Sequence, residues 1–221
     1  MKFLRRLTLV LTLILAGCGS DGANLQFFNA SPDGPALDVL FDNDVVLFDI
    51  DSETFVQYRE VNAGNTTIRL NQSGTSRTLA ETPASLTKNQ DYTLIALGSA
   101  ASMDALLLVD NNSIDQESTA KVRFVHASPS SGALDFYLTN PGTDLSGVNP
   151  LLSDLAFGEA SDYLIVGANT YQVRATLTGT KTVVIDTGNF VISSSQVRTG
   201  VAVDKAGGGL PPSIVFLPDR L

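Results

Sequence analysis

One phrase occurs twice in this chain, and the repetition limits what the chain can fold into. Residues 23–40 read ANLQFFNASPDGPALDVL, and residues 120–137 read AKVRFVHASPSSGALDFY. The match continues further on, because Tyr58-Arg-Glu-Val-Asn-Ala-Gly-Asn recurs as Tyr163-Leu-Ile-Val-Gly-Ala-Asn. Insertions between the copies fall in segments rich in Pro, Gly, Asn and Asp, where loops tolerate them. The sequence therefore predicts two copies of one small domain, each of roughly a hundred residues.

The matched segments have the alternating pattern of β-strands. In residues 171–177 the odd positions are Tyr, Val, Ala and Leu, and the even positions are Gln, Arg and Thr. This period of two, together with frequent turn residues, predicts antiparallel β-sandwiches. No segment after residue 22 shows a convincing helical period. We expect strands at 24–29, 36–41, 45–49, 54–60, 65–71, 76–81, 91–97 and 104–109, and in the second copy at 121–126, 133–138, 154–157, 161–166, 170–177, 181–187, 196–203 and 213–217.

The predicted fold class is all-β, with two tandem antiparallel sandwiches of immunoglobulin-like or transthyretin-like type. A true immunoglobulin domain is not supported, because the chain has one Cys and no Trp. We place the first domain at residues 23–110 and the second at 120–221. Between them, residues 111–119 read NNSIDQEST, a polar segment predicted to be a linker that leaves room for a hinge.

The N-terminus has the features of an export signal. Residues 1–17 begin with cationic side chains, and the apolar run that follows at 7–16 is shorter than the ~20 residues that cross a bilayer. Leu-Ala-Gly-Cys at 15–18 resembles the lipobox of bacterial lipoproteins, in which cleavage after Gly17 leaves Cys18 as an acylated first residue. Each buried CH₂ of an acyl chain contributes ~0.8 kcal/mol to membrane binding. The alternative is an ordinary secreted protein with a stray Cys at the cleavage site.

This resemblance implies a location in the cell as well as a membrane anchor. Gly19 follows the lipobox Cys, where inner-membrane retention in Gram-negative lipoproteins usually uses Asp, so outer-membrane delivery is favoured. Residues 18–22 would form a lipid-anchored tether of at most ~18 Å, which keeps the first domain close to the membrane. The chain would then contact the membrane through acyl chains on Cys18.

The charge of the chain excludes some partners. The formal net charge is −9, and loss of Lys2, Arg5 and Arg6 with the leader would make it −12. Such a surface repels phosphate groups, so nucleic acid and anionic lipid headgroups are not expected to bind. The absence of Trp leaves few flat aromatic surfaces for stacking sugars. No cofactor is predicted.

The shared Ala-Ser-Pro phrase predicts a turn. Proline fixes φ near −65° and removes a donor, so the strand must end there, and the hydroxyl of Ser31 or Ser128 can bond a following amide. Asp38 and Asp135 each follow seven residues after that Ser, and we expect them to fold back and accept hydrogen bonds across the turn. The functional alternative is a ligand pocket at each turn.

His126 is the single histidine, and it raises the alternative of hydrolase chemistry with Ser128 and Asp135. The first copy has Asn29 at the same place, and Asn and His can both bond local backbone. No G-x-S-x-G motif occurs, and a catalytic triad needs a geometry that neighbours on one strand do not normally provide. We therefore predict that His126 caps the turn.

An acidic cluster occurs in the first copy only. Carboxylate oxygens suit Ca²⁺, but side chains two residues apart on a strand lie ~7 Å apart, too far to share an ion unless the loop curls. A solvated acidic hairpin is favoured over a cation loop, and any metal remains unknown. The candidate residues are Asp42, Asp44, Asp49, Asp51 and Glu53.

The repeated Ala-Ser-Pro and Ala-Leu-Asp phrases, the Val-Asn-Ala-Gly-Asn stretch and the Tyr-Thr-Leu-Ile-Ala-Leu-Gly strand resemble the family known as domain of unknown function 4397. The resemblance extends over nearly all of residues 23–219. It departs in the second copy at Arg198 and Gly200, where the first copy has Tyr92 and Leu94. It implies a fold and an exported bacterial setting, often with tandem copies, but it implies no substrate.

These observations leave three hypotheses in order. The first is a non-enzymatic envelope lipoprotein that presents loops or edge strands to a protein or polymer partner, for adhesion or scaffolding. The second is an envelope protein that binds a small ligand or a divalent cation, with residues 42–53 as the candidate site. An enzyme ranks third, because the sequence offers no convincing set of nucleophile, base or metal ligands.

Overall fold

The computed structural model describes residues 22–114 and 116–220, and in this part of the chain every regular element is a β-strand. The predicted signal peptide, Gly17, Cys18 and most of the tether lie outside the described residues. Within residues 22–114 and 116–220, no helix is long and apolar enough to span a membrane.

Each predicted strand has a counterpart in the structure, within a few residues at its ends. The first sandwich contains β1 (Gly22–Asn29), β2 (Leu37–Phe41), β3 (Asp44–Ile50), β4 (Phe55–Asn62), β5 (Gly64–Gln72), β6 (Thr78–Leu86), β7 (Asp91–Ser99) and β8 (Ser102–Asp110). The second contains β9 (Thr119–Ala127), β10 (Leu134–Thr139), β11 (Leu152–Leu155), β12 (Leu164–Gly167), β13 (Asn169–Leu177), β14 (Val183–Ile192), β15 (Val197–Val203) and β16 (Ser213–Arg220).

The two sandwiches have the same topology. The first consists of sheets β4-β1-β7-β8 and β3-β2-β5-β6, and the second of sheets β12-β9-β15-β16 and β11-β10-β13-β14. All neighbouring strands in these sheets are antiparallel except β1–β7 and β9–β15, which are parallel. A parallel pair needs a long crossover, and the intervening strands, which mostly build the opposite sheet, provide it. The duplication in the sequence is therefore a duplication of the fold.

Each sandwich encloses its own apolar core. In the first, Phe27, Leu37 and Ile68 are fully buried between the sheets. In the second, Phe124 and Phe136 stack with ring centroids 4.6 Å apart. The alternation predicted from sequence brings these side chains to the inner faces of the sheets.

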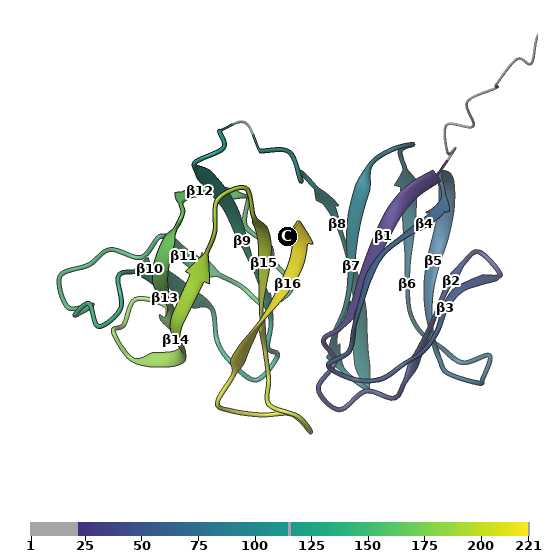
Figure 1. Cartoon of the computed structure of the whole chain (residues 1–221). Coiled ribbons are helices and arrows are strands. Elements are labelled where there is room, and N and C mark those ends of the chain that lie inside the picture. Colours follow the sequence, from purple (N-terminus) through teal and green to yellow (C-terminus); the bar gives the residue numbers. More distant parts are fainter. Residues whose placement is uncertain (1–21, 115, 221) are drawn as a thin grey trace, which may run out of the picture.

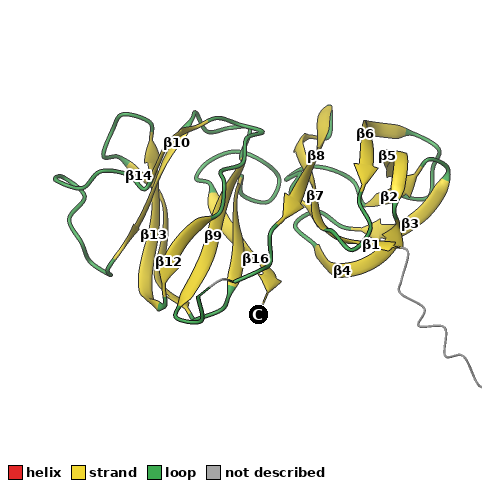
Figure 2. Cartoon of the chain, turned by 90° about the horizontal axis from the view of Figure 1, so that it is seen from above, coloured by secondary structure: helices red, strands yellow, loops and turns green. Residues whose placement is uncertain are grey.

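A third apolar cluster lies between the two sandwiches. It contains Phe28 and Ile95 from the first, and Val125, Val201 and Leu217 from the second, all completely buried. Figures 1 and 2 show the two sandwiches side by side, with the sheet of β1 and β7 beside the sheet of β9 and β15. The hinge suggested by the polar linker is therefore wrong, because bending there would expose this shared core to water.

The turns of both sandwiches meet at the end of the molecule opposite Gly22. β1 starts at Gly22 and ends at Asn29, where the first Ser-Pro turn follows. The backbone amide of Gly207, in the loop after β15, donates to the Pro32 carbonyl oxygen at 2.8 Å. The start of β1 at Gly22 and the end of β8 lie at the other end (Figure 1).

Candidate functional site

The two Ser-Pro turns are capped in the same way, as predicted. Oδ1 of Asn29 accepts a hydrogen bond from the Ser31 amide at 3.3 Å, and Nδ1 of His126 accepts one from the Ser128 amide at 3.3 Å. Because Nδ1 is the acceptor, the proton of the His126 ring lies on Nε2, which faces the Gly132 carbonyl oxygen at 3.0 Å. His126 therefore fixes a turn with a neutral ring.

Ser128 does not act with His126. Its hydroxyl donates to the buried carboxylate of Asp204, which also accepts from the Ser130 hydroxyl at 2.6 Å and the Gly209 amide at 3.1 Å. Burial alone would raise the pKa of Asp204, but these hydrogen bonds outweigh it and lower the pKa. Sequence reasoning missed Asp204, because it lies 76 residues from Ser128.

The first copy has no such carboxylate. Gly98 stands at the position that aligns with Asp204, and the buried Ser31 hydroxyl has no hydrogen-bond partner among the described residues. The two Ser-Pro turns therefore share their backbone cap and differ in what holds their serine.

Asp38 and Asp135 stabilise other turns than the ones expected. Asp38 accepts from the amides of Asp49 at 2.9 Å and Gly74 at 3.2 Å. Asp135 accepts from the amides of Asp154 at 2.8 Å and Gly179 at 3.0 Å. The prediction that they fold back onto the Ser-Pro turn is wrong, because each points sideways from its strand toward the neighbouring hairpins. Their structural role is the same in both copies.

Replacing His126 with Asn should keep the fold and reduce its acid sensitivity. Burial lowers the pKa of His126 and outweighs the opposing effects of Gly132, Asp204 and Glu159. A lowered folded-state pKa gives stability that is present above about pH 6.5 and is lost as the pH falls, at up to about 1.4 kcal/mol per pH unit. Thermal unfolding of H126N between pH 7.5 and 5.5 should show a shallower loss than the unchanged protein. If the melting temperatures of H126N and of the unchanged protein fall equally as the pH is lowered, burial of a neutral His126 does not contribute to the acid sensitivity.

The acidic cluster is spread along an exposed hairpin. Asp42 accepts from the Thr67 amide at 2.9 Å, and Asp49 accepts from the Ser73 hydroxyl at 3.2 Å. Asp44, Asp51 and Glu53 are also exposed. Within residues 22–114 and 116–220, no three Asp, Glu, His or Cys side chains gather so that they could hold a metal ion.

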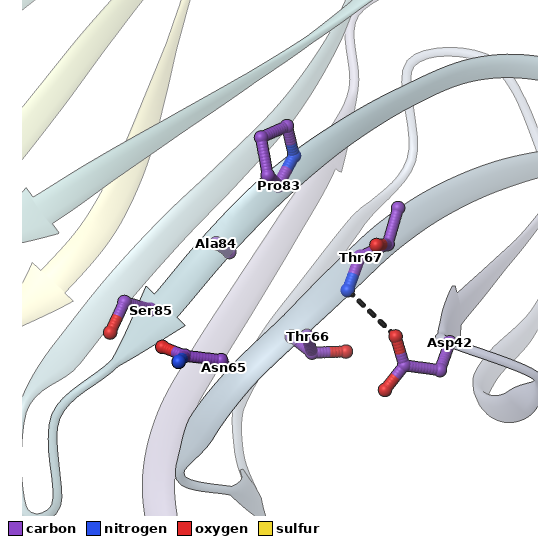
Figure 3. Close-up of a pocket in the computed structure, with 7 residues that line it drawn as sticks. All are labelled: Asp42, Asn65, Thr66, Thr67, Pro83, Ala84 and Ser85. Atoms are coloured by element: carbon purple, nitrogen blue, oxygen red, sulfur yellow. Dashed lines mark hydrogen bonds between the residues drawn. The ribbon is translucent and has the colours of Figure 1, made fainter.

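A groove lies beside the acidic hairpin on the first sandwich (Figure 3). It encloses about 540 Å³ and is lined by Asp42, Asn65, Thr66, Thr67, Pro83, Ala84 and Ser85. Most of these side chains are small, which leaves a hollow over β5 and β6. The buried hydroxyl oxygen of Thr66 has no hydrogen-bond partner among the described residues. The groove can offer a carboxylate, an amide and hydroxyl groups to a polar ligand, and sequence reasoning found only Asp42.

A polar network crosses the apolar interface between the sandwiches. Arg123 on β9 is 3% exposed and forms an ion pair with Asp110, whose side chain is fully buried at the end of β8. Its guanidinium also donates to the hydroxyl oxygens of Thr199 at 2.7 Å and Thr93 at 3.0 Å, and it lies 4.6 Å from the centre of the Tyr163 ring. These contacts join side chains of both sandwiches around one cation.

A second buried carboxylate completes the network. Asp219 on β16 accepts hydrogen bonds from the side-chain Nε2 of Gln26 at 2.8 Å, from the Tyr163 hydroxyl at 3.0 Å and from the Thr199 hydroxyl. Burial raises the pKa of Asp219, and Arg123 and Thr199 oppose this only in part, while the charge of Asp110 adds to it. Burial likewise raises the pKa of Tyr163, so its hydroxyl remains a donor.

The network has an approximate two-fold arrangement. Equivalent residues of the two copies occupy equivalent places, in the pairs Gln26/Arg123, Tyr58/Tyr163, Thr93/Thr199 and Asp110/Asp219. Only the first pair differs in charge. Two buried carboxylates therefore lie close to one guanidinium, and the network joins side chains of the two sandwiches.

The sequence matches a model of one protein family, described as Domain of unknown function (DUF4397), over residues 23–137. This is more than half of the chain. The chain belongs to the DUF4397 family. The match covers the first sandwich and continues through β9 into β10, so it includes both Ser-Pro turns and the Arg123–Asp110 ion pair, and it ends before the rest of the second sandwich.

Other comparisons place this DUF4397 protein beside solved structures of low similarity. The C-terminal domain of AlgF from Pseudomonas aeruginosa has 18% identity and a TM-score of 0.33, covering 41% of this chain and 100% of that one. A family CBM26 module of Amy13K from Eubacterium rectale, in complex with maltoheptaose, has 9% identity and a TM-score of 0.28, covering 90% and 98%. A structure of α-glucan binding by a streptococcal virulence factor has 8% identity and a TM-score of 0.28, covering 81% and 92%. No curated protein matches the sequence.

Proposed function

We propose that this DUF4397 protein is a lipid-anchored protein of the bacterial envelope that serves as a rigid, non-enzymatic binding or scaffolding module. The observation that carries the proposal is the interior shared by the two sandwiches, where Phe28, Ile95 and Val125 are fully buried and Arg123 pairs with Asp110 across the boundary. A scaffold or adhesin needs binding loops held at fixed spacing, and a fused pair of sandwiches provides that.

The direction of the chain supports presentation away from a membrane. An anchor at Cys18 would leave only three residues, 19–21, between it and Gly22, where β1 begins. The Ser-Pro turns and the loop after β15 lie at the other end, joined by the Gly207–Pro32 hydrogen bond. A protein or polymer partner would meet this end. Gly19, in place of the Asp that usually retains lipoproteins at the inner membrane, favours the outer membrane.

Replacing Cys18 with Ser should abolish lipid attachment. Without the thiol no acyl chain can be added, and the chain should lose all incorporated label from radioactive palmitate and leave the membrane fraction. The matched control is Ser20→Ala, which changes the tether but leaves the thiol and should behave like the unchanged protein. Membrane fractionation of the Cys18→Ser protein with label still incorporated would refute the anchor.

Small-ligand binding is a second candidate function. It is favoured by the groove over β5 and β6 and by the unpartnered hydroxyl of Thr66 within it. A neutral polyhydroxy compound offers the alternating donors and acceptors that Asp42, Asn65 and Ser85 could bind. Titration with neutral oligosaccharides, followed through the amide NMR signals of residues 65–67, tests this candidate.

A further inference from the structure

The sheet β3-β2-β5-β6 of the first sandwich presents apolar side chains to solvent. Figures 1 and 2 show this sheet on the side of the first sandwich that faces away from the second. Val39 on β2 points into the core, so Leu40 lies on the outer face, where it pairs in register with Val45 of β3. Leu47 is buried, so its neighbour Phe48 also points outward, and Val45 and Phe48 are 55% and 73% exposed. Apolar groups that gather on one exposed face mark an interaction surface.

A charged pair continues this row of side chains across the sheet. Arg69 on β5 pairs in register with Leu40, and Glu81 on β6 pairs with Arg69. The Arg69 guanidinium donates to the Glu81 carboxylate at 3.3 Å and to the carbonyl oxygen of Asp42. A guanidinium has five N–H groups, so it can donate to a further carbonyl oxygen. The outer face therefore combines apolar side chains with a cation that can bond a peptide backbone.

The equivalent face of the second sandwich is covered by part of the chain itself. Tyr137 and Arg174 pair in register there. They stand in the places that Leu40 and Arg69 take in the first sandwich, but Tyr137 is only 2% exposed. The cover is the segment 140–151, which joins β10 to β11, whereas a short turn joins the equivalent strands β2 and β3.

Side chains of the sheet hold this segment by its backbone. Arg174 Nη2 donates to the Thr143 carbonyl oxygen at 2.7 Å, and Lys181 Nζ donates to the Val148 carbonyl oxygen at 2.5 Å. Leu145, in the middle of the segment, is buried. The second sandwich therefore shows what fits on this kind of face, namely a loop with one buried aliphatic side chain and a carbonyl oxygen that accepts from the arginine.

The residues around the bare face of the first sandwich specify the charge of a partner. Asp42, Asp44 and Asp49 are exposed on the hairpin of β2 and β3, and Glu81 is exposed on β6. The chain as a whole carries a net charge of −9. Partners in a complex present opposite charges to each other, which speeds their encounter and fixes their orientation. A loop with basic residues beside its aliphatic side chain complements this acidic rim.

We propose that the outer face of the first sandwich, around Phe48 and Arg69, binds a loop of a partner protein that carries an aliphatic side chain next to basic residues. The aliphatic side chain lies on Phe48 and Leu40. A carbonyl oxygen of the loop accepts from Arg69, as that of Thr143 accepts from Arg174 in the second sandwich. This goes beyond the proposed function, because the face belongs neither to the anchor nor to the Ser-Pro end, and its failure would leave both of those standing.

Amide NMR of the full-length protein, in a Cys18→Ser background, tests the proposal with three capped synthetic peptides of residues 140–151. The first peptide carries Asp144→Lys, which places a base beside Leu145. The second carries Asp144→Lys together with Leu145→Ala, which removes the aliphatic side chain. The third is unchanged and keeps its acid.

The first peptide should shift the amide signals of residues 45–48 and of Arg69. The unchanged peptide should bind about fivefold more weakly, because it brings an acid to an acidic rim, and the peptide without the leucine should cause no shift. Tyr137 and Arg174 lie on the covered face of the second sandwich, so their signals should not move. Shifts of equal size at those two residues, or no shift from the first peptide, would overturn the proposal.

Two variants of the protein assign the surface. Phe48→Ser should weaken binding of the first peptide about tenfold or more, whereas Ile165→Ser, which removes a 67% exposed side chain from the second sandwich, should not alter it. Both side chains are exposed, so folding should be preserved. Sedimentation velocity should show a monomer. An equal loss of binding in both variants, or a dimer that Phe48→Ser dissociates because a second copy covers the face, would overturn the proposal.

Discussion

Replacing Arg123 with Met should lower the free energy of unfolding by about 3–5 kcal/mol, which is the usual cost of removing one partner of a buried ion pair. Met keeps much of the apolar volume of the Arg side chain, so the loss reports the charge and the hydrogen bonds. Asp110 and Asp219 would then remain buried with no cation beside them. Urea unfolding at neutral pH measures the change, which is a large part of the stability of a typical domain.

A second variant separates the charge from the packing. Adding Asp110→Asn to Arg123→Met removes one of the two uncompensated carboxylates, so the double variant should be more stable than Arg123→Met alone. The exposed pair Arg69–Glu81 is the control, because its ion pair is exposed to solvent and Arg69→Met should cost less than about 1 kcal/mol. A loss for Arg123→Met as small as that for Arg69→Met would contradict the role of the network.

Replacing Asp219 with Asn should remove a pH dependence that the unchanged protein shows as the pH rises above about 3.9. The pKa of Asp219 is raised in the folded protein, mainly by burial. The stability it contributes is therefore complete below the unfolded pKa of about 3.9 and is lost as the pH rises through the raised folded value. One proton accounts for a slope of up to about 1.4 kcal/mol per pH unit across this interval.

The comparison must be made as a difference, because other carboxylates titrate in the opposite sense. Burial opposes ionisation of Asp38 and Asp204, but hydrogen bonds outweigh it and lower both pKa values, so these groups stabilise the fold above about pH 4 and lose that effect in acid. Subtracting the pH profile of Asp219→Asn from that of the unchanged protein isolates Asp219. The difference should fall with rising pH. A difference for Asp219→Asn that does not change with pH would show that the folded protein does not raise the pKa of Asp219.

The strands could be predicted because their signal is local. Period-two alternation, as in residues 171–177, depends only on which face of a strand meets the core. Residues 91–99 and 119–127 differ, since almost every position is buried. These strands are covered on both faces, but residues 119–127 include Lys121, Arg123 and His126, so the sequence did not predict the contact between the sandwiches.

The site residues could be predicted only where a side chain acts on its own turn. Asn29 and His126 bond an amide two residues away, and their role followed from the sequence. Asp204 reaches Ser128 across 76 residues, and Gln26 reaches Asp219 across 193, so no local pattern announces either contact. The equivalence of Tyr58 and Tyr163 could be recognised from the repeat. Their hydrogen bonds to Asp110 and Asp219 could not, because these bonds depend on how the two sheets pack.

A distance distribution between the two sandwiches tests the central claim most directly. Spin labels at Ser76→Cys and Ser194→Cys, both at exposed positions, report on the first and second sandwich in a Cys18→Ser background. Double electron–electron resonance should give a single narrow distribution of distances between the two labels. Adding Arg123→Met should either broaden this distribution or leave it narrow in a protein of lower stability. A broad distribution in the protein with Arg123 intact would mean that the sandwiches move independently, and it would contradict the account.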